Sequence, residues 1–149
     1  MTSSQGTREY LNKALSLLLA EDDDSLRETL SHFFSSQGFQ VFQACSGTEA
    51  VEVALKKQIA FSVMDINMPG YSGIEALRFI TRQRGGLLPC IFMSGDTSLE
   101  VMQKALGAGG FSFVSKPIQM ELMQRSVDRL IHKFFRDLIP GTEWEKRTR

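Results

Sequence analysis

The ten residues FSVMDINMPG, at positions 61–70, place an acidic residue at the end of a short apolar run and a turn directly after it. The run FSVMD has the length and the composition of a β-strand. The residues Met68, Pro69 and Gly70 favour a turn, because proline fixes its φ angle and glycine tolerates positive φ. We therefore expect a strand that ends at Asp65 and a loop that begins there.

Short apolar runs and longer helical patterns alternate on both sides of this stretch. The runs LLLA and CIFM lack the alternation of apolar and polar residues that is typical of a strand with one exposed face, so they favour central parallel strands buried on both faces. The predicted strands are 15–20, 39–44, 61–65, 87–93 and 111–115, and the predicted helices are 25–37, 48–57, 72–84, 98–106 and 120–138. This order predicts an α/β fold, a parallel sheet covered by helices.

Helix-capping patterns support these boundaries. Ser46 with Glu49, Ser72 with Glu75 and Thr97 with Glu100 each have the spacing of a capping box. Gly38 follows a predicted helix and suits the left-handed residue that often ends one.

Length, charge and composition exclude several classes of protein. The chain has 149 residues, 42% of them apolar, and its 17 basic residues balance 17 acidic ones, which describes one globular domain. Zero net charge argues against direct binding to nucleic acid, and no apolar stretch approaches the ~20 residues of a membrane helix. Cys45 and Cys90 lie far apart, the first directly after the predicted strand 39–44 and the second within 87–93, so we expect buried thiols and a cytoplasmic protein.

Five polar residues follow or end the apolar runs, and this pattern predicts a single pocket. They are Glu21, Asp22, Asp65, Ser94 and Lys116. The carboxyl ends of parallel strands meet at one edge of a sheet, where such folds bind ligands. Three neighbouring carboxylates repel one another, so one would take up a proton unless a cation neutralised the group, and oxygen ligands of this kind select Mg²⁺. With such an ion and Lys116 screening the phosphoryl oxygens, Asp65 could attack a phosphoryl group, and Ser94 would supply a hydroxyl donor.

These segments resemble the receiver domain of response regulators in two-component signalling systems. The resemblance rests on LLLAEDDDSLR, MDINMPGYSG, IFMSG and FVSKP, which occur in this order within about residues 15–138. It implies a flavodoxin-like fold, a five-stranded parallel sheet between two layers of helices. It also implies a phosphoryl-accepting signalling switch rather than an enzyme.

Carried over residue by residue, the resemblance assigns roles within the pocket. Asp65 would be phosphorylated by a histidine kinase or phosphotransfer protein, with Asp22 and Asp65 binding Mg²⁺ directly. Glu21 would act through water, and the backbone carbonyl of Asn67 would complete the protein ligands. Ser94 and Phe113 would move together as the switch. A cis peptide bond between Lys116 and Pro117 is typical of the family.

Several positions depart from the commonest family pattern. Glu21 stands where aspartate is usual, Ser94 where threonine is commoner, and 60–62 (AFS) where the lead-in to the third strand is usually more polar. Gly109 and Gly110 replace the usual Gly-Ala, which should loosen the preceding loop. The positions that tune the lifetime of the phosphoryl group hold Asn67 and Asp96, as in the fast-hydrolysing chemotaxis type.

Simpler interpretations exist for most of these residues. Asp23 and Asp24 favour the start of a helix through its dipole, and Ser94, Lys116 or Phe113 taken singly would be structural. Two other functions stay open: a Mg²⁺-dependent phosphohydrolase that acts through an aspartyl phosphate, and an interaction module that is never phosphorylated.

The segments outside the domain raise a separate question. We divide the chain into an extension at 1–14, a receiver domain at 15–138 and a tail at 139–149, in which Trp144 suggests a contact. The apolar residues of the last helix exceed what packing on one sheet requires. Tyr10, Leu11 and Leu15 should cover Phe134, Phe135 and Leu138; the alternative is a homodimer or partner surface. Only residues 139–149 follow the predicted last helix, so we expect the output to be an unknown downstream partner, self-association or a region outside this sequence.

Overall fold

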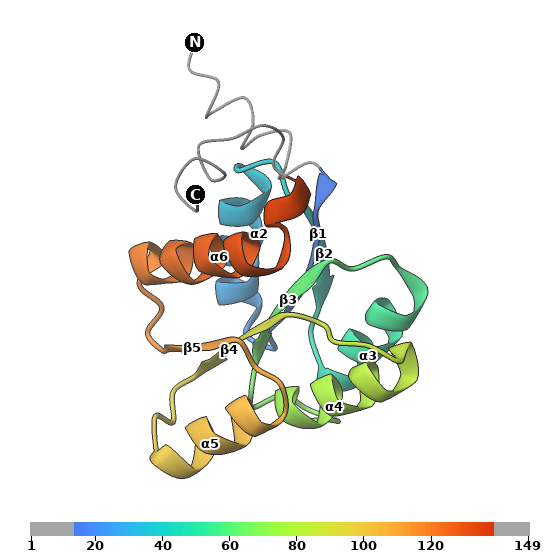
Figure 1. Cartoon of the computed structure of the whole chain (residues 1–149). Helices are drawn as coiled ribbons and strands as arrows, with labels where there is room; N and C mark the ends of the chain where they lie inside the picture. Colours follow the sequence, from blue (N-terminus) through green and yellow to red (C-terminus); the bar gives the residue numbers. More distant parts are fainter. Residues whose placement is uncertain (1–13, 139–149) are drawn as a thin grey trace, which may run out of the picture.

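The computed structural model describes residues 14–138, which form one five-stranded parallel sheet with helices on both faces (Figure 1). The strands run in the order β2-β1-β3-β4-β5. They are β1 (Ser16–Ala20), β2 (Gln40–Ala44), β3 (Phe61–Asp65), β4 (Cys90–Ser94) and β5 (Ser112–Ser115). The helices are α2 (Asp24–Ser35), α3 (Gly47–Lys56), α4 (Gly73–Arg84), α5 (Leu99–Gly107) and α6 (Met120–Phe134), followed by the 3-10 turn η1 (Arg136–Leu138). The predicted flavodoxin-like fold is confirmed.

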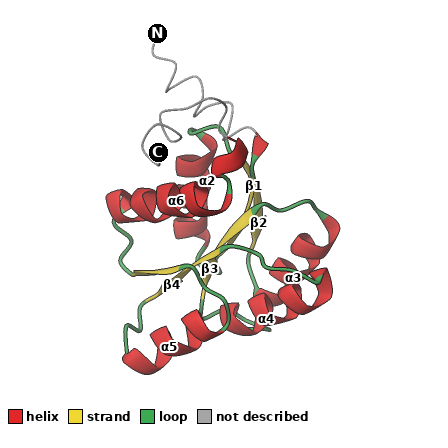
Figure 2. Ribbon diagram, in the orientation of Figure 1, coloured by secondary structure: helices red, strands yellow, loops and turns green. Residues whose placement is uncertain are grey.

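Two hydrophobic cores fill the space between the three layers. Helices α2 and α6 cover one face of the sheet, and α3, α4 and α5 cover the other (Figure 2). Successive strand residues alternate between these cores, because side chains along a strand point to opposite faces. In β1, Leu17 and Leu19 join the first core, whereas Leu18 and Ala20 join the second. Burial on both faces explains why the central strands β1, β3 and β4 lack a polar alternation.

The helix caps agree only partly with the predicted capping boxes. Ser72 and Glu75 form a complete box at α4. At α3, Ser46 accepts the N–H of Glu49, but the Glu49 carboxylate accepts the N–H of Cys45. At α5 the N-cap is Ser98, so the prediction of Thr97 was wrong by one residue. Gly38 has a φ of 100°, which confirms the expected left-handed residue.

Two predictions made from apolar runs were wrong in detail. The last helix ends at Phe134 rather than at residue 138, because Phe135 leaves the helical region with a φ of −127°. Cys45 is exposed, because β2 ends one residue before it. Cys90 is buried in β4 as expected, and burial raises the pKa of its thiol to about 12.

Only part of the predicted contact between the N-terminal extension and α6 lies within the residues that the structure describes. Phe134 and Phe135 are half-buried and pack against the core that contains Leu15. Tyr10 and Leu11 lie outside the described residues, as does the tail from residue 139. Within residues 14–138, no helix is both long and apolar enough to cross a bilayer.

The glycine pair before β5 is tightly packed at its second member. A Cβ at Gly110 would lie 2.8 Å from the carbonyl oxygen of Ala105 and 2.8 Å from two ring carbons of Phe92. Gly109 has a φ of 101°, which favours glycine. The expected loosening of this loop is not tested, but the close approach supplies a packing reason for Gly110.

We predict that Gly110→Ala lowers the free energy of unfolding by about 1–3 kcal/mol, because the added methyl group must displace backbone or a buried ring. The matched control is Gly107→Ala, where no heavy atom lies within 4 Å of the new Cβ. Urea unfolding of both variants measures the difference. Equal stability of the two variants would contradict the prediction.

Candidate functional site

The five polar residues predicted to converge do lie at one edge of the sheet. Asp65 and Ser94 end the neighbouring strands β3 and β4, with Asp65 in register with Met93. Glu21 and Lys116 directly follow β1 and β5. Because all five strands are parallel, these positions share the carboxyl edge of the sheet.

Lys116 joins two of the acidic residues. Its Nζ lies 2.6 Å from Oε1 of Glu21 and 3.0 Å from Oδ2 of Asp65. The Glu21 side chain is fully buried, and that of Asp65 is 5% exposed. A buried carboxylate costs several kcal/mol unless a charge compensates it, so the ammonium group is what allows both acids to occupy this place. The Lys116–Pro117 peptide bond is cis, as the resemblance implies.

The three carboxylates can converge on one metal ion. Glu21, Asp22 and Asp65 each offer an oxygen, and these atoms all lie within 4.8 Å of one another. Oε2 of Glu21 accepts the N–H of Asp23, and Oε1 contacts the ammonium group of Lys116. A donor set made of oxygen atoms alone suits a hard cation such as Mg²⁺.

Burial strongly perturbs the protonation of Glu21. It raises the pKa of this carboxyl group to about 7, and the charge of Asp65 adds to the rise. The hydrogen bonds from Lys116 and from the Asp23 N–H act in the opposite direction. For Lys116 itself, burial lowers the pKa, but the hydrogen bonds to Glu21 and Asp65 outweigh this, so its pKa is raised. Three carboxyl groups therefore surround a single ammonium group in the pocket.

The loop after β3 fixes the Asp65 carboxylate. The backbone N–H of Asn67 donates to Oδ1 of Asp65 at 3.2 Å, and Lys116 holds Oδ2. Gly73, at the start of α4, donates its N–H to the carbonyl of Ile66. A Cβ at Gly73 would lie 2.2 Å from the carbonyl oxygen of Asp65, so only glycine fits at this close approach.

The loop after β4 is organised around Ser94 and Asp96. The buried hydroxyl of Ser94 accepts the N–H of Asp96 at 3.0 Å, and Asp96 accepts the N–H of Ser98 at 2.9 Å. Hydrogen bonds from Ser98 lower the pKa of the exposed Asp96 carboxyl group. Since Ser94 uses an oxygen lone pair here, its O–H remains a potential donor.

One residue near the site was missed in the sequence. The guanidinium of Arg27, on α2, donates to the carbonyl of Glu21 at 2.8 Å and to the carboxylate of Asp24 at 2.7 Å. Asp23 is the N-cap of α2, as its expected helix-start role requires, but Asp24 forms this ion pair. The signal for this ion pair in the sequence is the spacing of Asp24 and Arg27, an acidic residue three positions before an arginine at the start of a predicted helix.

The fold and this pocket define a class of signalling domain. Residues 17–128 match the family model of the response regulator receiver domain, so the chain belongs to that family. Receiver domains are phosphoacceptor switches of two-component phosphorelays and bind Mg²⁺ at an acidic pocket. They act as regulators rather than as conventional enzymes.

Several characterised proteins are similar to parts of this chain. A transcriptional activator, ExaE of Pseudomonas putida, is 33% identical over 119 residues, which cover 78% of this chain and 55% of that protein. A cyclic di-GMP phosphodiesterase of Thermotoga maritima is 29% identical over 125 residues, covering 80% of this chain and 33% of that protein. The chain thus spans only a third to about half of these relatives.

A solved structure supports the fold. Chemotaxis protein CheY4 of Vibrio cholerae is 26% identical, with a TM-score of 0.73, over 78% of this chain and 98% of that one.

We predict that Glu21 makes the metal-free protein less stable as the pH rises. With a pKa near 7 in the folded state and an ordinary value of 4.5, the folded protein keeps a proton between these values that the unfolded chain has lost. The free energy of unfolding should therefore fall across this window. Relative to Glu21→Gln, the wild type should lose about 1–2 kcal/mol of unfolding free energy between pH 5 and pH 8.

Urea unfolding in EDTA at both pH values measures this difference. The control is Glu52→Gln, an exposed glutamate of α3, which should match the wild type at both pH values. If the free energies of unfolding of the wild type and Glu21→Gln changed with pH to the same extent, the raised pKa of Glu21 would be contradicted.

Proposed function

We propose that Asp65 accepts a phosphoryl group from a phosphohistidine of a histidine kinase or phosphotransfer protein. The observation that carries this proposal is the position of Lys116, whose ammonium group contacts both Asp65 and Glu21 within a buried pocket. Asp65 is held at both oxygens and lies beside two more acids, an arrangement suited to a nucleophile.

The chemistry is a transfer between two nucleophiles. A carboxylate oxygen of Asp65 forms a bond to phosphorus while the phosphorus–nitrogen bond of the donor breaks, and the released imidazole takes up a proton. Lys116 would bind a phosphoryl oxygen, and the Ser94 hydroxyl would donate to another. The domain would thereby catalyse its own phosphorylation and, with water as nucleophile, its dephosphorylation.

The acidic residues would hold the metal ion. Asp22 and Asp65 would bind Mg²⁺ directly, Glu21 would act through a water molecule, and the Asn67 carbonyl would complete the set. When bound, Mg²⁺ neutralises charge on the phosphoryl oxygens.

The response would pass from Ser94 to Phe113. Ser94 ends β4, and Phe113 lies half-buried in β5, in register with Phe92 two residues before Ser94. A phosphoryl group that draws the Ser94 hydroxyl toward Asp65 would open space for the Phe113 ring. The surface of β5 and α6 would then change for a downstream partner.

The wider organisation belongs to the same proposal. Residues 15–138 form the receiver domain, with 1–14 as an extension and 139–149 as a tail. We place the protein in the cytoplasm, acting through protein partners without direct contact to nucleic acid or membrane. A homodimer through the final helix is the alternative use of its apolar surface.

The proposal predicts a covalent adduct that depends on one residue. With acetyl phosphate and Mg²⁺, the intact wild-type mass should rise by one phosphoryl group, whereas Asp65→Asn should stay unchanged because an amide cannot form the acyl phosphate. The control is Asp23→Asn, an exposed acid that caps α2 and should still be phosphorylated.

Other outcomes would favour the alternative functions. Steady turnover of a generic phosphate ester by the wild type would support a phosphohydrolase. Failure of the wild type both to gain mass and to bind beryllofluoride with Mg²⁺ would support an interaction module that is never phosphorylated.

We also predict a short-lived phosphoryl group from Asn67 and Asp96. Both residues are exposed beside the pocket, where their side chains can admit or position the attacking water. After removal of the donor, the phosphorylated fraction should decay within minutes when followed by intact mass. A phosphorylated form that survives for many hours with Mg²⁺ would refute the assignment.

A further inference from the structure

The side chain of Arg27, on α2, is hydrogen-bonded to three segments around the acidic residues of the pocket. Its Nη1 donates to the carbonyl oxygen of Glu21 at 2.8 Å, and its Nε donates to Oε1 of Gln43 on β2 at 3.2 Å. Its Nη2 pairs with Oδ1 of Asp24 at 2.7 Å. Only 14% of the side chain is exposed. Because all three nitrogens of the planar group are engaged, the guanidinium is held in one orientation.

Of the three acids of the pocket, Asp22 has the least support from its own side chain. Glu21 and Asp65 both contact the ammonium group of Lys116. Asp22 is exposed, and its carboxylate forms no hydrogen bond or ion pair with any residue in the range 14–138. The direction of the Asp22 side chain is consequently set by its backbone.

The two peptide groups that flank Asp22 are both held by hydrogen bonds. The carbonyl of the preceding peptide group, that of Glu21, accepts the hydrogen bond from Arg27. The N–H of the following peptide group, that of Asp23, donates to Oε2 of Glu21 at 3.1 Å. The N–H of Glu21 also donates to the carbonyl of Ala44 at 3.0 Å, which anchors this segment to β2. Arg27 therefore supplies the side-chain contact that opposes rotation of the peptide group before Asp22.

We infer that Arg27 is a positioning residue for Mg²⁺, which fixes the direction of the Asp22 carboxylate by holding the carbonyl of Glu21. This role rests on the Mg²⁺ site proposed above. Arg27 acts through the backbone and does not bind the ion, because a guanidinium group has no acceptor atom. Ligands that are already in place bind more tightly, since less conformational freedom is lost on binding.

The charge of Arg27 and its positioning role have opposite effects on the affinity for Mg²⁺. A guanidinium group beside the pocket repels a second cation, so the loss of its charge alone would strengthen Mg²⁺ binding. The loss of its hydrogen bond to Glu21 would weaken binding, because the backbone before Asp22 is released. The direction in which the dissociation constant changes therefore separates the two effects.

Titration calorimetry with MgCl₂ measures this dissociation constant for the wild type, Arg27→Met and Arg27→Lys. We expect Arg27→Met to bind Mg²⁺ about tenfold more weakly, as is typical when a residue that orients a metal ligand is replaced. Arg27→Lys should lose less affinity, because lysine keeps the charge and one donor but lacks the planar group. Urea unfolding checks that each variant is folded under the conditions of the titration.

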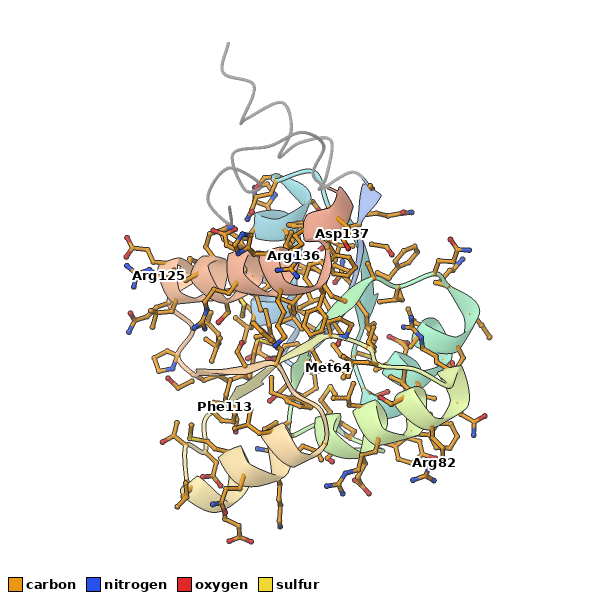
Figure 3. All side chains as sticks on the ribbon, in the orientation of Figure 1. Met64, Arg82, Phe113, Arg125, Arg136 and Asp137 are labelled. Carbon is orange, nitrogen blue, oxygen red and sulfur yellow. The ribbon has the colours of Figure 1, made fainter. Side chains whose placement is uncertain are left out.

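Two arginines on α4 provide matched controls. Arg84 also donates through Nη1 to a backbone carbonyl, that of Ile59 at 3.2 Å, but at the opposite edge of the sheet. Arg82 is exposed, and Figure 3 shows it away from Met64, the residue that precedes Asp65 in β3. Arg84→Met and Arg82→Met should each bind Mg²⁺ as tightly as the wild type.

The Mg²⁺ dependence of phosphorylation by acetyl phosphate gives a second readout. At a low Mg²⁺ concentration, Arg27→Met should gain phosphoryl mass more slowly than the wild type. At saturating Mg²⁺ the two rates should agree, because the weaker binding is then overcome. A loss of rate that saturating Mg²⁺ does not restore would indicate a general structural role and would overturn the inference.

The remaining outcomes distinguish the positioning role of Arg27 from the proposed function. Equal or tighter Mg²⁺ binding by Arg27→Met would overturn the positioning role alone, as would an equal loss of affinity in Arg84→Met. A wild type that binds no Mg²⁺ would overturn both. A wild type that binds Mg²⁺ but gains no phosphoryl group would contradict the role of Asp65, whereas a weaker affinity of Arg27→Met would still support the role of Arg27.

Discussion

The contact of one ammonium group with two buried carboxylates is the constraint on which the rest of the structure depends. Glu21 and Asp65 come from different strands, and their charges repel each other in a pocket with little solvent. Lys116 compensates both, and it reaches them only because β5 ends at the same edge of the sheet. The cost of burying like charges thus ties the first, third and fifth strands to one arrangement.

The need for rigid positioning explains the rest of the fold. Strands buried on both faces are held by two cores, so their carboxyl ends have little freedom to move apart. Close glycine contacts add to this: Gly73 brings the start of α4 against the carbonyl of Asp65. The loops between these elements are left to carry exposed residues such as Asn67 and Asp96.

The element order and the pocket could be predicted from the sequence because both follow from local patterns. Apolar runs without alternation predict central strands, and the polar residue at the end of each run predicts the site. The predictions that were wrong or missing concern features that depend on the tertiary structure. Cys45 lies past the end of β2, Phe135 ends α6, and the interactions of Arg27 join residues from three segments that no local pattern links. The packing of Gly110 against Phe92 likewise depends on a neighbouring strand.

Strand β5 contributes residues both to the pocket and to the groove that it forms with α6. This strand is at the edge and pairs with β4 alone, whereas β1, β3 and β4 have neighbours on both sides. An edge strand with one ladder of hydrogen bonds can shift at lower cost than a central one. Lys116 follows β5 in the pocket, and Phe113, three residues earlier, lines the groove. The other edge strand, β2, carries none of the proposed site residues. If Lys116 bound a phosphoryl oxygen, a change in the groove would therefore pass through β5.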